Sequence, residues 1–238
     1  MRSIRFALEY SKADLLLRDS RIRSTIIVFG GSRCVSPEIV EFQRLNTTDP
    51  KIARQLTWYE DARTFGRIAS MRGSAFTSQN EWRDNVIATG GGPGLMEAAN
   101  RGAHEVGAAT IGFNIRLPAE QKANRYVTPG LNFEFHYFAM RKMHLAMRAN
   151  ALVVFPGGFG TLDELFELLT LQQTKKTAAV PIVLYDRKYW QEMINFEKLV
   201  AEDMISASDL ELFEFADTPE NIWSCIARRG LTAHLNDR

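Results

Sequence analysis

The chain has 238 residues, and its 45% hydrophobic and 24% charged content is that of an ordinary soluble globular protein. The formal net charge of +1 gives no whole-chain signal for nucleic acid or an anionic membrane, so we expect neither as a partner. Two cysteines without metal-ligand spacing, and no apolar run that fits a signal peptide or membrane span, favour a cytoplasmic protein without disulfides or a metal site.

The first third of the chain contains two predicted helices and one predicted strand. Apolar residues at helical spacing predict a leading helix over 4–18, and the β-branched run 25–29 predicts a buried strand. Residues 34–50 are rich in Pro, Asn and Thr, which is typical of a loop. Helical spacing returns over 51–72, and the polar stretch 73–84 is expected to be irregular.

The rest of the chain alternates short apolar runs with helical segments. Strands are expected at 86–88, 109–113, 152–155 and 181–185, and helices at 95–105, 138–149, 161–173, 187–203 and 219–229. Strands that are apolar throughout and alternate with helices predict a parallel sheet covered on both faces. We therefore expect one doubly wound α/β domain over residues 1–238, with a helical extension at about 1–23.

Glycine is unevenly placed: nine of the 16 glycines fall in three clusters, at 30–31, 90–94 and 157–160. Each cluster follows a predicted strand, and ligands of open parallel sheets bind beyond the carboxyl ends of the strands. Glycine allows close approach of the backbone, and a loop that opens a helix favours an anion such as phosphate. Each cluster alone is also compatible with a plain tight turn, but three on one edge favour a phosphate site.

Two familiar nucleotide signatures are absent. No Gly-Lys pair occurs, which excludes a Walker A loop, and the third glycine of G-x-G-x-x-G is replaced by Leu95 in one cluster and by Asp163 in the other. The sequence therefore predicts neither a P-loop NTPase nor an NAD enzyme of the usual type.

Glu164 has two interpretations. Thr161-x-x-Glu164 before an apolar run matches a capping box, in which the glutamate bonds back to the start of its own helix. The alternative is a carboxylate that meets the sugar of a bound nucleotide, and the two roles can be combined. The basic pair Arg141 and Lys142 fits a solvated helix face, although the aromatic residues 133–138 before it favour a segment packed against the body.

These residues resemble a known family. The segment 156–164 (PGGFGTLDE) resembles the PGGxGTxxE motif of the LONELY GUY proteins, cytokinin riboside 5′-monophosphate phosphoribohydrolases long mislabelled as lysine decarboxylases. Residues 90–100 are similar to the family's GGGxGLM segment, 30–33 to its first Gly/Ser loop, and 140–142 to its Arg-Lys pair. The resemblance covers roughly residues 24–223, with Gly31 where many members have serine.

The resemblance implies a Rossmann-like fold, at least a homodimer, and hydrolysis of the N-glycosidic bond of AMP or a cytokinin riboside monophosphate. It makes Arg141 and Glu164 the catalytic pair, with Glu164 beside the anomeric carbon and Arg141 holding Glu164 ionised. No cofactor is expected. The residues expected to contact phosphate or nucleotide are Gly30, Ser32, Gly91, Gly92, Met96, Lys142, Gly157, Gly158, Gly160 and Thr161.

Two functions other than hydrolysis are compatible with a glycine-rich phosphate site or with the family's earlier name. A nucleotide-binding or sensing protein without catalysis needs only the loops and the helix dipole. Lysine decarboxylation normally uses pyridoxal phosphate on a lysine, and Lys142 is the only lysine in the motif-bearing stretch 132–164, so we discount it.

Overall fold

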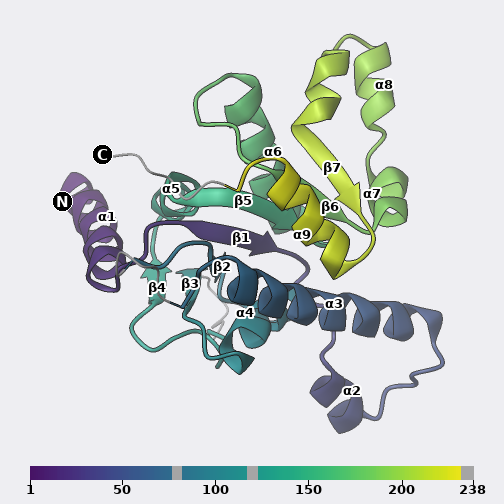
Figure 1. Ribbon diagram of the computed structural model, residues 1–238, viewed down its shortest axis with the longest axis horizontal. Coiled ribbons are helices and arrows are strands. Elements are labelled where there is room, and N and C mark those ends of the chain that lie inside the picture. The colour runs from purple at the N-terminus through teal and green to yellow at the C-terminus, as the bar shows by residue number, and fades with distance from the viewer. Residues whose placement is uncertain (77–81, 117–122, 232–238) are drawn as a thin grey trace.

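The computed structural model describes residues 1–76, 82–116 and 123–231. Seven parallel strands form a sheet in the order β4-β3-β2-β1-β5-β6-β7 (Figure 1). The strands are β1 (Thr25–Phe29), β2 (Val86–Thr89), β3 (Thr110–Ile115), β4 (Asn132–Phe135), β5 (Ala149–Val154), β6 (Ile182–Tyr185) and β7 (Phe213–Ala216). The chain builds outward from β1 to β4, returns to pair β5 with β1, and then builds the other way. The sheet therefore has its topological switch point between β1 and β5.

Helices cover both faces of the sheet (Figure 1). On one face α3 (Pro50–Arg72) packs against both α4 (Leu95–Glu105) and α9 (Pro219–Arg228). On the other face lie α5 (Phe138–Met147) and α6 (Phe159–Gln173), and α1 (Arg2–Asp19) packs against α5. The remaining helices are α2 (Pro37–Gln43), α7 (Arg187–Met193), α8 (Phe196–Ala201) and the 3-10 helix η1 (Ala207–Leu212).

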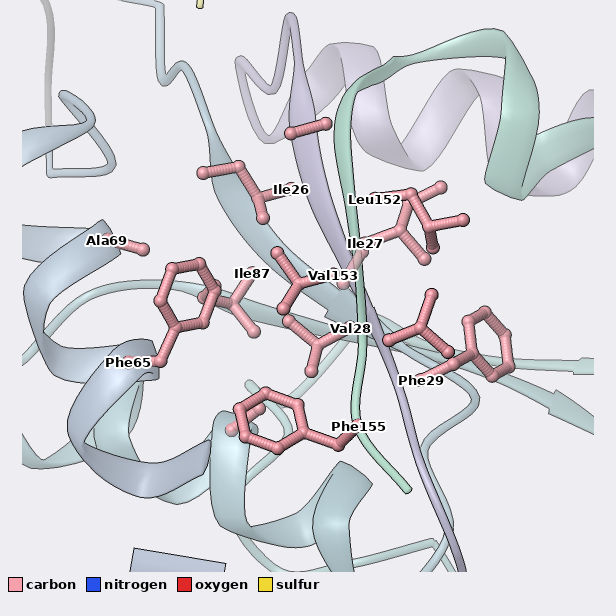
Figure 2. Packing of buried hydrophobic residues seen from close by; sticks show 14 of the residues in the cluster. Ile26, Ile27, Val28, Phe29, Phe65, Ala69, Ile87, Leu152, Val153 and Phe155 are labelled. Carbon is pink, nitrogen blue, oxygen red and sulfur yellow. The ribbon is translucent and has the colours of Figure 1, made fainter. Parts of the chain in front are cut away.

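The central strands are buried on both sides. In β1, Ile26 and Val28 point toward Phe65 of α3, whereas Ile27 and Phe29 point toward the opposite face (Figure 2). All four strand side chains are buried. Burial on both faces explains why residues 26–29 are all apolar. The helices on both faces confirm the predicted doubly wound α/β sheet.

Four sequence-based predictions were wrong in detail. Residues 34–50 contain α2, whose first turn is capped by the Ser36 hydroxyl accepting the Ile39 N–H. The edge strands β4 and β7 were not predicted. The helix expected to reach Ala149 ends at Met147, because Ala149 pairs with Thr25 in the sheet. The single helix expected at 187–203 is two helices, α7 and α8.

Of the stretch 73–84, expected to be irregular, residues 77–81 lie outside the described residues. Across the described part of the chain, no helix combines the length and apolar character needed to cross a bilayer.

Candidate functional site

A pocket of about 750 Å³ lies beyond the carboxyl ends of β1 and β5, at the switch point. Its size is within the usual range for small-molecule sites. Its walls come from the three glycine loops, the ends of β1 and β3, and helices α4, α5, α6 and α7. The lining residues are Phe29, Gly30, Gly31, Ser32, Arg33, Gly90, Met96, Asn114, Ile115, Phe138, Arg141, Gly157, Gly158, Phe159, Gly160, Thr161, Leu162, Tyr189 and Met193.

The charged side chains that line the pocket are cationic, although the chain is nearly neutral. Among the described lining residues, Arg33 and Arg141 are the charged side chains, and none is a carboxylate. Helix α6 begins at Phe159, and the backbone N–H groups of Gly158, Phe159 and Gly160 donate to no acceptor in the described part of the chain. Free N–H groups at a helix N-terminus attract anions. The pocket is therefore suited to a phosphate or another anion.

Arg141 on α5 and Glu164 on α6 form an ion pair at this wall. Nη2 of Arg141 lies 2.5 Å from Oε1 of Glu164, and both side chains are buried. Arg141 also lines the pocket, and its guanidinium lies over the Phe138 ring at 5.1 Å. Glu164 instead faces the small hollow between α5, α6 and the sheet, beside Ile27 and Leu152. Arg141 therefore connects the pocket with the buried carboxylate.

Burial raises the pKa of Glu164 above its ordinary value of 4.5. Arg141 acts in the opposite direction, by charge and by hydrogen bond, but its effect is smaller than that of desolvation. The effect expected of Arg141 is therefore present, because Arg141 lowers the pKa of Glu164, but burial outweighs it and the net pKa is raised. Such a carboxylate takes up a proton more readily than an exposed one.

Comparison with known proteins identifies the family. A family profile described as "Possible lysine decarboxylase" matches residues 96–226, more than half of the chain. Cytokinin riboside 5′-monophosphate phosphoribohydrolase LOG4 of Arabidopsis thaliana is 25% identical over 175 residues, which are 66% of this chain and 80% of that protein. The chain belongs to the LONELY GUY family.

Other members of the LONELY GUY family align over shorter stretches. The probable cytokinin riboside 5′-monophosphate phosphoribohydrolase LOG4 of Oryza sativa subsp. japonica is 28% identical over 136 residues, 56% of this chain and 58% of the relative. LOG3 of Arabidopsis thaliana is 27% identical over 141 residues, 58% of this chain and 64% of the relative.

Solved structures resemble the fold at lower identity. The molybdenum cofactor binding protein from Rippkaea orientalis has a TM-score of 0.55 and 21% identity, covering 87% of this chain and 98% of that one. TM1055, a structural genomics target, has a TM-score of 0.55 and 18% identity, covering 86% and 99%. At these identities the likeness concerns the fold alone.

The capping-box interpretation of Glu164 was wrong. Helix α6 begins at Phe159 after the cap residue Gly158, so Thr161 lies inside the first turn. The Thr161 N–H donates to the Gly158 carbonyl at 2.9 Å. The Glu164 side chain turns toward Arg141 rather than back to the helix start. In this member of the LONELY GUY family, Glu164 is therefore not a cap.

The structure brings most of the expected contact residues together. Gly30, Ser32, Met96, Gly157, Gly158, Gly160 and Thr161 line the pocket together with Arg141.

Gly91, Gly92 and Lys142 lie elsewhere. The Gly91 carbonyl accepts the Asn124 N–H at 2.9 Å, and the Gly92 carbonyl accepts Nδ2 of Asn124 at 3.0 Å. Lys142 Nζ lies 2.8 Å from Asp163 and 2.7 Å from Glu167. Gly91 has φ of 70°, and a Cβ there would lie 2.3 Å from the Asn114 amide, so it is required for the turn.

Several residues of the pocket were not predicted from the sequence. Tyr189 and Met193 lie on α7, about 30 residues beyond the third glycine cluster, and Asn114 lies near the end of β3. Only the strand order, which puts β6 beside β5, shows that α7 reaches the pocket. In residues 1–76, 82–116 and 123–231, no group of three His, Cys, Asp or Glu side chains is arranged to hold a metal ion.

Proposed function

We propose that the protein hydrolyses the N-glycosidic bond of nucleoside 5′-monophosphates and releases a free base and ribose 5-phosphate. The observation that carries this proposal is the buried Arg141–Glu164 pair at the wall of a cationic, glycine-lined pocket. The activity for which the relatives are named, on cytokinin riboside 5′-monophosphates, supports the same reaction type.

The 5′-phosphate binds at the start of α6. Gly157, Gly158, Gly160 and Thr161 line this part of the pocket, where helix N–H groups and the helix dipole favour an anion. Gly30 and Ser32 belong to the facing loop after β1. Binding the phosphate fixes the ribose, so remote binding energy helps to place the anomeric carbon.

In the proposed reaction Glu164 acts at that carbon, which requires a bound nucleotide to displace Arg141 so that the carboxylate reaches the pocket. Cleavage passes through an oxocarbenium-like state, which a nearby carboxylate stabilises. The ionised Glu164 accepts a proton from water as the water oxygen bonds to the anomeric carbon. The C–N bond breaks, its electron pair leaves with the base, the base takes up a proton from solvent, and Glu164 then returns its own proton to solvent. A raised pKa suits a group that must accept a proton in this step.

The base is placed against apolar side chains. Met96, Phe138 and Met193 line the pocket and offer an apolar surface for a planar ring. We propose that the base is adenine or an N6-substituted adenine of the cytokinin type. These side chains contribute contact area, whereas the phosphate loop contributes charge recognition.

We further propose a homodimer or larger homo-oligomer. Phe159 and Phe166 of α6 are exposed and line one hollow together with Lys142 of α5, and we term this hollow the α5–α6 patch. Phe159 is 92% exposed, and clustered apolar exposure of this kind marks an association surface. Association of two copies through this patch places each pocket close to the subunit interface.

Nucleotide binding without catalysis is the second candidate. It is favoured by one observation: Glu164 does not line the pocket, because Arg141 lies at the wall in its place. A protein that keeps this arrangement when a nucleotide is bound will recognise the phosphate but not cleave the substrate.

The deciding experiment uses a panel of monophosphates. The purified protein is incubated with AMP, isopentenyladenosine monophosphate, GMP and CMP, and released base is separated by chromatography. Base release from at least one adenine nucleotide is expected. No base from any substrate would exclude hydrolysis, and a rise in melting temperature with AMP but no base would favour the binding module.

A further inference from the structure

The phosphate loop has a support that comes from outside the motif. The Tyr189 hydroxyl, on α7, donates a hydrogen bond of 2.8 Å to the carbonyl oxygen of Gly157. The Tyr189 side chain also lines the pocket. The preceding carbonyl, of Pro156, is held at 2.9 Å by the N–H of Gly31 from the first glycine loop. Two consecutive peptide planes at the start of the loop are therefore fixed by external donors.

Peptide geometry makes this support directional. In a planar trans peptide the C=O and the following N–H point in opposite directions. Holding the Gly157 carbonyl against Tyr189 therefore turns the Gly158 N–H away from α7, where it has no acceptor within the described residues. A rotated peptide would present an oxygen to the bound anion in place of a hydrogen-bond donor. Because glycine permits many backbone conformations, this peptide needs such a constraint.

We propose that Tyr189 is a positioning residue that fixes the Gly157–Gly158 peptide so that its N–H faces the 5′-phosphate. This inference rests on the proposed function, because it assumes that the loop binds phosphate. It adds a residue that lies outside the PGGxGTxxE motif. Tyr189 acts through the loop backbone and is not assigned a step in bond cleavage.

The inner side of the same peptide is already filled. A Cβ on Gly157 would lie 2.2 Å from Oγ1 of Thr161, so the loop packs directly against the first turn of α6. The backbone at Gly157 is therefore held between Thr161 on one side and the Tyr189 hydroxyl on the other. Loss of the hydroxyl leaves the packing in place and removes the contact that orients the carbonyl.

Tyr189 is itself held rigidly. Its N–H donates to Oδ1 of Asp186 at 3.0 Å, and Oδ2 of Asp186 accepts Trp58 Nε1 at 2.8 Å and Arg54 Nη2 at 3.0 Å. The Trp58 and Tyr189 rings meet edge to face, with centroids 5.6 Å apart. Asp186 has φ of 69°, a left-handed conformation that a non-glycine residue keeps only when its surroundings determine it.

The test compares two variants that each lose one hydroxyl. Tyr189→Phe removes the donor to Gly157, and Tyr185→Phe removes the hydroxyl that bonds Asp61 of α3, away from the pocket wall. Isothermal titration measures the Kd for ribose 5-phosphate, AMP and adenosine, and urea unfolding measures stability. Tyr189→Phe is expected to raise the Kd for both phosphates about three- to tenfold, since a hydrogen bond contributes about 0.5–1.5 kcal/mol. The affinity of Tyr189→Phe for adenosine should stay within about twofold of wild type. Tyr185→Phe should lower the free energy of unfolding without changing any Kd.

Each other outcome contradicts the inference. Unchanged phosphate affinity in Tyr189→Phe excludes the positioning role and leaves the proposed hydrolysis standing. An equal loss of affinity for adenosine, or an equal loss of phosphate affinity in Tyr185→Phe, shows that Tyr189 only supports the fold. If the wild-type protein binds neither ribose 5-phosphate nor AMP, the inference and the proposed function fail together.

Discussion

Arg141 reaches the pocket wall while it holds the carboxylate of Glu164 in the interior, with 2.5 Å between Nη2 and Oε1. The two side chains come from neighbouring helices, α5 and α6, so the pair depends on how these helices pack. The Nε of Arg141 is buried and has no hydrogen-bond partner within the described residues. A ligand in the pocket therefore meets Arg141 first, and any change at Arg141 is transmitted to Glu164.

The pH dependence of activity should follow the raised pKa of Glu164. Ionised Glu164 is the active form, so kcat/KM should rise with pH along an acidic limb and then reach a plateau. The midpoint of that limb should lie above the ordinary carboxyl pKa of 4.5, because burial outweighs the effect of Arg141. Initial rates with AMP between pH 4 and 9 measure it. A limb with its midpoint at or below 4.5 would contradict the buried position of Glu164.

The same pKa shift affects stability, with a definite sign. A carboxyl whose folded pKa is raised contributes stability below its unfolded pKa, and loses that contribution as pH rises through the folded pKa. The free energy of unfolding of wild type, measured relative to Glu164→Gln, should therefore decrease from pH 4 to pH 7. Urea unfolding at several pH values gives this difference. An increase over that range would mean that the pKa of Glu164 is lowered.

Substitution of Arg141 should reveal the free-energy cost of burying the Glu164 carboxylate without a partner. Arg141→Met leaves a buried carboxylate without its partner, and we expect it to lower the free energy of unfolding by about 3 kcal/mol at pH 7. The loss should shrink as pH falls toward 4.5, where the carboxyl takes up a proton. The double variant with Glu164→Gln should recover part of the loss. Additive effects of the two substitutions would show that the pair is not coupled.

The α5–α6 patch should control assembly. Phe166→Lys places a charge in this patch, and we expect a smaller particle by light scattering after size-exclusion chromatography, because an apolar interface does not tolerate an unpaired charge. Phe42→Lys is the matched control, since Phe42 is 88% exposed on α2, outside the patch. A wild-type protein that is already monomeric, or the same shift in Phe42→Lys, would contradict this role.

The leading helix should stabilise the helix that carries Arg141. The Glu9 carboxylate on α1 accepts the N–H groups of His136 and Tyr137 at 3.2 and 3.4 Å, where α5 begins without a side-chain cap of its own. Glu9→Ala should lower the free energy of unfolding by about 1 kcal/mol. Lys12→Ala, at an exposed position of the same helix, should change it by less than about 0.5 kcal/mol. Equal effects would show that Glu9 does not support the start of α5.

The sequence predicts the central sheet well because β1 and β5 are buried on both faces. Their central residues, 26–29 and 151–154, are apolar without a break, and a glycine cluster follows each strand. The edge strands escape prediction for the opposite reason. In β4 only Phe133 and Phe135 are buried, and the alternate positions Asn132 and Glu134 are exposed, so four residues carry little signal.

The candidate site could also be predicted only in part. Arg141 and Glu164 are predicted from motifs, and the structure pairs them directly. The capping box fails because the helix begins two residues before Thr161, which the Thr-x-x-Glu spacing alone does not reveal. The contact between Tyr189 and Gly157 could not be predicted from the sequence, because it depends on the order of β5 and β6 in the sheet.

Substitution of Glu164 tests its catalytic role most directly, and the neighbouring Asp163 offers a matched control. Glu164→Gln keeps the size of the side chain and one accepting oxygen but removes the base, whereas Asp163→Asn changes a half-exposed carboxylate that faces Lys142. Adenine and ribose 5-phosphate released from AMP are quantified for wild type and both variants, beside the Kd for AMP.

Wild type and Asp163→Asn should release the two products in equal amounts at similar rates. Glu164→Gln should bind AMP within about threefold of wild type and turn it over at least about 100-fold more slowly. Full turnover by Glu164→Gln would contradict the catalytic role of this carboxylate, and no release by wild type would contradict hydrolysis itself.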